Sequence, residues 1–90
     1  MKVLITGMSG TGKSTLLAGL AALGHATVDT DYGPWTDDRG RWDEQRMTEL
    51  LSAPGELVVS GTVENQREFY PFFAHVVLLS APLDVVLEGR

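Results

Sequence analysis

The sequence predicts one α/β domain built around a parallel β-sheet, and three observations lead to this fold class. Apolar runs of strand length alternate with stretches whose apolar residues recur at helical spacing, which is typical of parallel α/β folds. A glycine-rich turn joins the first of these strands to the first helix. The run Leu57–Ser60 reads as a strand that is buried on both faces, as in parallel sheets. The 90 residues allow a single domain, spanning residues 1–90.

Two strands, two helices and a long loop are expected in the first half of the chain. The first helix has leucines at three- and four-residue steps and ends before Gly24, since glycine commonly follows a helix. The loop is polar and is broken by Gly33, Pro34 and Gly40, which disfavours regular structure. In chain order, the expected elements are a strand at Lys2–Thr6, a helix at about Gly12–Leu23, a strand at about His25–Val28, the loop Thr30–Arg41 and a helix at about Trp42–Ser52.

Two further strands and two further helices are expected in the second half. A short helix ends at Pro71, because proline cannot donate the hydrogen bond that continues a helix. Ser80 is a suitable N-cap residue and Pro82 suits a first helical turn, so the spacing predicts a last helix that begins here. In chain order, these elements are a strand at Leu57–Ser60, a helix at Asn65–Tyr70, a strand at His75–Leu79 and a helix whose apolar face starts with Val85, Val86 and Leu87.

The segment from Gly7 to Ser14 reads G-x-x-x-x-G-K-S and lies between the first strand and the first helix. This context is the one in which the motif forms a phosphate-binding loop. Its backbone N–H groups and the positive end of the following helix make a concave site for an anion. Lys13 can reach the β- and γ-phosphates of ATP, and the Ser14 hydroxyl can ligate Mg²⁺. The competing interpretation is a glycine-rich turn between two ordinary elements.

The expected cofactors are therefore ATP and Mg²⁺, both held at one edge of the sheet. Glycine is needed in the loop because the backbone must approach phosphate closely. The residues expected to contact the nucleotide are Gly7, Ser9, Gly10, Thr11, Gly12, Lys13, Ser14 and Thr15.

Asp29 and Asp31 follow the second strand as D-T-D. Because ligands bind beyond the carboxyl ends of the strands in open α/β sheets, both carboxylates are expected near the phosphate loop. One carboxylate could hold a metal-bound water, and the other could accept a proton from an attacking hydroxyl. The alternative is a solvated loop closed by an Asx turn.

Polar residues after the third strand are candidates for a substrate pocket. Gly61 either lets the backbone approach a substrate closely or simply forms a tight turn. Arg67 could grip an anionic substrate through its guanidinium group, or it could be a surface charge of a short helix. Thr62, Glu64 and Asn65 could line the same pocket.

Several aromatic and basic residues have structural interpretations. Tyr32, Pro34 and Trp35 could form an apolar wall for a substrate, but we favour a role in anchoring the long loop. Arg39 and Arg41 are expected to be solvated, and His25 and His75, which lack ligand-spaced partners, to be structural. The aromatic residues expected to pack beneath the sheet are Phe69, Tyr70, Phe72 and Phe73.

Composition excludes several function classes. The net charge of −5 makes general nucleic-acid binding a poor fit, because such binding needs clustered basic residues. The absence of cysteine rules out disulfides and thiolate chemistry. No apolar run reaches the length of about 18 residues that a membrane span needs, and no secretory leader is evident, so we expect a cytoplasmic protein without membrane contacts.

On these residues the chain resembles the P-loop small-molecule and nucleotide kinases, in particular shikimate, gluconate and adenylate kinases. The resemblance rests on Gly7–Ser14, Asp29-Thr30-Asp31, Gly61 and Ser80-Ala81-Pro82, and it runs in order along nearly the whole chain. It implies a three-layer αβα fold with strand order 2-3-1-4-5 and transfer of the ATP γ-phosphoryl group to a small acceptor. It also implies that Asp29 is the metal-side carboxylate and Asp31 the substrate-side one. With the motif and the guanidinium argument above, the candidate catalytic residues are Lys13, Asp31 and Arg67, and the candidate metal-side residues are Ser14 and Asp29. The glycine run that follows strand three in shikimate kinases is reduced here to Gly61, so the acceptor is left open.

The resemblance also predicts that these residues form the amino-terminal part of a longer kinase. The lid and the fifth strand of that family are expected beyond Arg90, which leaves the order 2-3-1-4 with the fifth strand missing. Strand four should then present an open edge, through which we expect self-association. The main functional hypothesis is a kinase for a small hydroxylated metabolite or nucleotide. The alternatives are a nucleotide-binding module with little or no phosphotransfer and, less favoured, a GTPase-type or AAA-type switch, for which no guanine-reading or Walker B motif is present.

Overall fold

The computed structural model describes residues 1–7, 12–81 and 84–88, with side chains to residue 79. Within these residues one five-stranded sheet has the order β2-β3-β1-β4-β5. The strands are β1 (Lys2–Gly7), β2 (Thr27–Asp29), β3 (Leu57–Ser60), β4 (His75–Ala81) and β5 (Asp84–Glu88). Strands β1 to β4 are parallel, and their order 2-3-1-4 is the predicted one.

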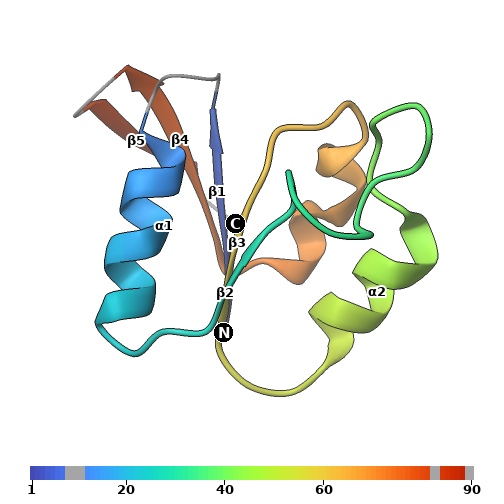
Figure 1. Cartoon of the computed structure of the whole chain (residues 1–90), viewed down its shortest axis with the longest axis horizontal. Coiled ribbons are helices and arrows are strands. Elements are labelled where there is room, and N and C mark those ends of the chain that lie inside the picture. The colour runs from blue at the N-terminus through green and yellow to red at the C-terminus, as the bar shows by residue number, and fades with distance from the viewer. Residues whose placement is uncertain (8–11, 82–83, 89–90) are drawn as a thin grey trace.

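The helices cover the two faces of the sheet unequally, as Figure 1 shows. Helix α1 (Lys13–Ala22) lies on one face, whereas α2 (Glu44–Ser52) and the 3₁₀ helix η1 (Gln66–Phe72) lie on the other. Helix α2 begins at Asp43, whose carboxylate accepts a hydrogen bond from the Arg46 N–H at 2.9 Å and so caps the first turn. This arrangement of helices on both faces of a mostly parallel sheet is an α/β fold, as predicted.

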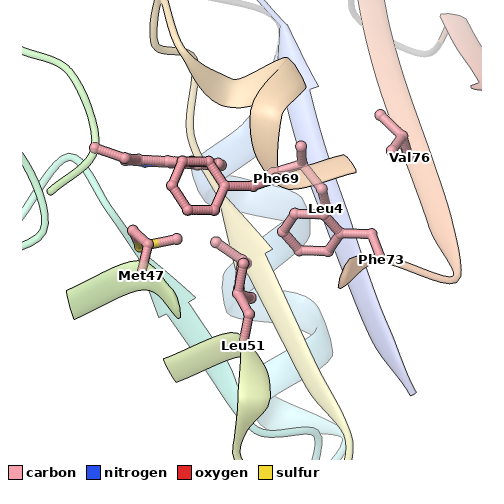
Figure 2. Packing of buried hydrophobic residues seen from close by; sticks show 8 residues of the cluster. Leu4, Met47, Leu51, Phe69, Phe73 and Val76 are labelled. Atoms are coloured by element: carbon pink, nitrogen blue, oxygen red, sulfur yellow. The ribbon is translucent and has the colours of Figure 1, made fainter. Parts of the chain in front are cut away.

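The larger core lies between the sheet and the α2 face. Its centre includes Trp42, which is 1% exposed and meets Phe69 edge to face with ring centroids 5.5 Å apart. Figure 2 shows side chains from α2, η1 and the sheet converging on this core. The buried members of this cluster are Leu4, Trp42, Met47, Leu51, Val59, Phe69, Phe73 and Val76.

The core on the α1 face is smaller, with four buried members: Ile5, Leu17, Val58 and Leu79. Leu17 is buried by α1, but Leu16 and Leu23 of the predicted apolar face are 37% and 78% exposed. An open apolar cleft of about 260 Å³ lies beside α1, toward the amino end of β1, where Met1 and Val3 contribute to its lining. Most of the apolar burial is therefore on the α2 side.

The predicted last helix is wrong. Residues Asp84–Glu88 form β5, which pairs antiparallel with β4 and places Val85 opposite Leu79. The run Val85-Val86-Leu87 is rich in β-branched residues, which favour strands, and a short apolar run does not distinguish a helix from a strand by its periodicity. The predictions of a missing fifth strand and of an open β4 edge are accordingly wrong as well, because β5 covers that edge.

The short helix after strand three also differs from the prediction. Element η1 is a 3₁₀ helix that continues through Pro71 to Phe72 instead of ending at Pro71. A 3₁₀ helix bonds each N–H to the carbonyl three residues earlier, and one interruption by proline is tolerated near its end. Phe69 and Phe73 are buried as predicted, whereas Phe72 is 37% exposed.

Among the described residues, no helix combines the length and the apolar character needed to cross a membrane.

Candidate functional site

The two ends of the predicted phosphate loop are held by glycines in unusual conformations. Gly7 ends β1 with φ +149°, and a Cβ there would lie 2.4 Å from the Leu79 carbonyl oxygen. Gly12 precedes α1 with φ +93°, in the left-handed region that favours glycine. The predicted contacts Ser9, Gly10 and Thr11 lie outside the described residues. Both described glycines therefore have a local physical reason to be glycine.

Helix α1 places the predicted phosphate-binding side chains in its first turn. Lys13 is half-buried, and its Nζ donates a hydrogen bond to the Gly7 carbonyl across the base of the loop. Ser14 and Thr15 are exposed. The first turn of α1 contains no acidic residue, so the positive end of the helix dipole is not compensated there by its own side chains. This helix end is suited to an anion.

Thr62, which follows β3, contacts the same glycine. Its Oγ1 donates to the Gly7 carbonyl and accepts from the Gly7 N–H at 3.1 Å. Thr6 Oγ1 lies 3.2 Å from Thr62 Oγ1 and 3.3 Å from Oε1 of Gln66. Thr62 was expected only as a pocket residue, and nothing in the local sequence signals its contact with Gly7, because 55 positions separate the two residues.

The D-T-D segment is held by its central residue. Thr30 is 1% exposed, and both its N–H and its hydroxyl donate to the Ser60 carbonyl, at 2.9 and 2.8 Å. Asp29 is half-buried and accepts a hydrogen bond from the Asp31 N–H at 3.0 Å, which is the Asx turn considered above. The Asp31 side chain is exposed at the same edge of the sheet.

Gly61 has a structural explanation besides the two expected roles. A Cβ at this position would lie 2.1 Å from Thr30 Oγ1 and 3.2 Å from Cζ2 of Trp42. Trp42 in turn donates from Nε1 to Thr30 Oγ1 at 3.0 Å. Side-chain packing inside the protein therefore requires a glycine here on its own, while the substrate approach and the tight turn stay predictions.

The remaining pocket candidates separate into structural and exposed residues. Asn65 accepts from the Trp42 N–H at 3.0 Å and donates from Nδ2 to the Trp42 carbonyl at 3.1 Å, so its amide group fastens the long loop. Trp35 packs against the larger core, as expected for an anchor, whereas Tyr32 is 74% exposed. Glu64 and Arg67 are exposed, and only such side chains remain free to meet a substrate.

The two predicted metal-side residues come from different elements, Asp29 from β2 and Ser14 from α1. Asp29 is in register with Ser60, and Ser60 with Ile5 of β1. Since neighbouring strands are about 4.8 Å apart, Asp29 lies about 10 Å across the sheet from β1. In the part of the chain that the structure describes, no group of three or more histidine, aspartate or glutamate side chains is placed to hold a metal ion.

The resolved pKa shifts lie away from this edge of the sheet. Backbone hydrogen bonds from Arg41 and Arg39 lower the pKa of Asp37 in the long loop. Arg41, expected to be solvated, is half-buried, with Nε 3.5 Å from the Asp37 carboxylate. A hydrogen bond from His25 at 2.6 Å lowers the pKa of Glu56. Both shifted groups thus stabilise loops.

Comparison of the chain with protein-family models, with curated proteins and with solved structures finds no match.

Proposed function

We propose that this protein is a P-loop kinase-like protein that binds Mg-ATP and transfers the γ-phosphoryl group to a small hydroxylated metabolite or nucleotide. The observation that carries the proposal is the strand–loop–helix unit of β1 and α1. Its motif, G-x-x-x-x-G-K-S, leaves Lys13 and Ser14 in the first turn of α1 beside a glycine that has no room for a side chain. The four parallel strands in the order 2-3-1-4 agree with the family that the sequence resembles.

The proposed roles follow the motif. Lys13 neutralises the β- and γ-phosphates, and the Ser14 hydroxyl ligates Mg²⁺. Magnesium takes oxygen ligands and keeps several waters, so one hydroxyl, the phosphates and a water held by Asp29 are a suitable set. Asp31 orients or deprotonates the acceptor hydroxyl, and Arg67 holds an anionic acceptor.

Calorimetric titration of the full chain with ATP, ADP, GTP and pyrophosphate, with and without Mg²⁺, tests the binding half of the proposal. Lys13→Met should weaken the binding of ATP by about 100-fold or more, because an ammonium contact with desolvated phosphates is removed. Arg39→Met removes the same charge from the exposed long loop and should leave the affinity within about twofold of the wild type. Equal losses in the two variants, or no binding by the wild type, would refute nucleotide binding at this loop.

A nucleotide-binding module with little phosphotransfer is the second candidate. Phosphoryl transfer needs positive charge around the transferring group in addition to the lysine of the loop. Lys13 contacts Gly7, whereas Arg67 is exposed, and this arrangement favours binding without transfer. Mass spectrometry of a metabolite and nucleoside panel incubated with Mg-ATP separates the two. Tight binding without any phosphorylated product supports the module and contradicts the kinase.

The structure changes the proposed route of self-association. The edge at β4 is paired, so any sheet pairing between copies uses β2 or β5, the two strands at the ends of the strand order. Light scattering across a concentration series tests whether copies associate.

A further inference from the structure

We propose that Thr62 is a positioning residue of the phosphate loop. Its hydroxyl keeps a hydrogen bond to the Gly7 carbonyl, so that the Lys13 ammonium can leave this carbonyl and contact a bound polyphosphate. The proposal rests on the function proposed above and concerns a residue that the motif does not contain. It starts from one carbonyl oxygen that receives two donors, the Lys13 ammonium and the Thr62 hydroxyl.

The energetic argument concerns what happens to that carbonyl when Lys13 moves. Gly7 is buried, and a buried carbonyl left without a donor destabilises the protein by about 1–3 kcal/mol. A carbonyl oxygen has two lone pairs, so it can accept from both donors at once. With Thr62 in place, Lys13 can turn to a phosphate while the Gly7 carbonyl keeps one hydrogen bond. Without the Thr62 hydroxyl, the same movement removes both of the side-chain donors that the carbonyl has among the described residues.

The surrounding network also involves Thr6 and Gln66. Thr62 Oγ1 accepts from the Gly7 N–H, and Thr6 Oγ1 lies 3.2 Å from it. The Thr6 hydroxyl donates to Gln66 Oε1 at 3.3 Å, and that oxygen also accepts from the Val63 N–H at 3.0 Å. The single proton of the Thr62 hydroxyl is the one donated to the Gly7 carbonyl.

The chain offers a direct readout, because it contains only two lysines, Lys2 and Lys13. Lys2 is buried at the opposite end of β1, where its Nζ donates to the Ala53 and Gly55 carbonyls, and it serves as an internal reference. NMR spectra of protein labelled at the lysine side chains therefore give one signal for each position. The informative variants are Thr62→Val, which removes the hydroxyl at nearly constant shape, and Thr62→Ser, which keeps it.

Without any ligand, Thr62→Val should shift the Lys13 side-chain signal and leave the Lys2 signal in place, whereas Thr62→Ser should reproduce the wild-type spectrum. With pyrophosphate as the probe, Thr62→Val should weaken binding about fivefold to tenfold, and Thr62→Ser should restore it to within about twofold. In a Lys13→Met background, Thr62→Val should change the affinity by less than about twofold, since no ammonium then leaves the carbonyl.

Two results overturn the proposal: a Lys13 signal that is unchanged in ligand-free Thr62→Val, or a loss of affinity on Thr62→Val that is equal in the wild-type and Lys13→Met backgrounds. The second result would mean that Thr62 acts only on the shape of the loop. Failure of the wild type to bind pyrophosphate overturns the proposed function instead. The ligand-free spectra then still decide whether Thr62 and Lys13 are coupled through the Gly7 carbonyl.

Discussion

Replacing Gly61 by alanine tests the packing that joins the D-T-D segment to the core. The added Cβ would lie 2.1 Å from Thr30 Oγ1, a buried atom that already accepts a hydrogen bond from Trp42. Overpacking of this kind destabilises a protein by about 1–3 kcal/mol, and a buried Trp42 N–H without its acceptor adds about 1–3 kcal/mol. We therefore expect Gly61→Ala to lower the free energy of unfolding by about 2–5 kcal/mol, a large part of the stability of a small domain.

Urea unfolding followed by tryptophan fluorescence and by circular dichroism measures this loss. Gly19→Ala is the matched control, because a Cβ at Gly19 in α1 meets nothing within 4 Å and should raise stability by about 0.5–1 kcal/mol. Adding Thr30→Ala to Gly61→Ala removes the clashing oxygen and should recover part of the loss. An unfolding midpoint of Gly61→Ala equal to that of the wild type would refute the packing argument and return Gly61 to a role in substrate approach.

For three further substitutions, the expected change in stability follows from a single contact of the replaced side chain or backbone. Gly7→Ala should destabilise the protein by about 2 kcal/mol or more in urea unfolding, because its Cβ meets the Leu79 carbonyl and its φ disfavours other residues; a stable variant contradicts this. Asp43→Ala should lower stability by about 1 kcal/mol through loss of the cap of α2, and the same midpoint as the wild type would exclude the cap. The hydrogen bond from His25 lowers the pKa of Glu56, so its stabilising contribution is present above the ordinary value of 4.5 and is lost as the pH falls through the lower folded-state pKa. Glu56→Gln should therefore be less stable than the wild type above pH 4.5, and the difference should shrink as the pH falls through the folded-state pKa of Glu56; a difference that does not shrink in acid would contradict the assignment.

Local sequence signals are sufficient to predict the parallel strands and their approximate positions. Leu57–Ser60 and the β1 segment are short, rich in β-branched or leucine residues and bounded by glycine or polar residues, and these properties do not depend on the rest of the chain. The run Val85-Val86-Leu87 has the same properties, whereas Ser80 and Pro82 are typical of a helix start, so the local signals conflict and the strand is what forms. Pairing with β4 decides the outcome at this position, and pairing is not visible in a local pattern.

The parts of the candidate site that could not be predicted are the contacts between distant residues. The motif identified Lys13 and Ser14 because their spacing to Gly7 is local. The reason for Gly61 depends on Thr30, which directly follows β2, and on Trp42, which directly precedes the N-cap of α2. A glycine after a strand has the same appearance in the sequence whether a substrate, a turn or a tryptophan excludes its side chain.

The segment Ser60-Gly61-Thr62 connects the two halves of the candidate site. Its first residue receives both hydrogen bonds from Thr30, and its last residue holds both backbone groups of Gly7. The middle residue has no side chain, and its N–H donates to the Ile5 carbonyl at 3.1 Å, which keeps β3 against β1 up to the start of the loop. Three consecutive residues at the end of β3 therefore connect the D-T-D segment with Gly7. A displacement of this segment moves the contacts of Thr30 and of Gly7 together. Substitutions at Ser60, Gly61 or Thr62 should therefore be coupled energetically to substitutions at Thr30 and Gly7, although Thr30 follows β2 and Gly7 ends β1.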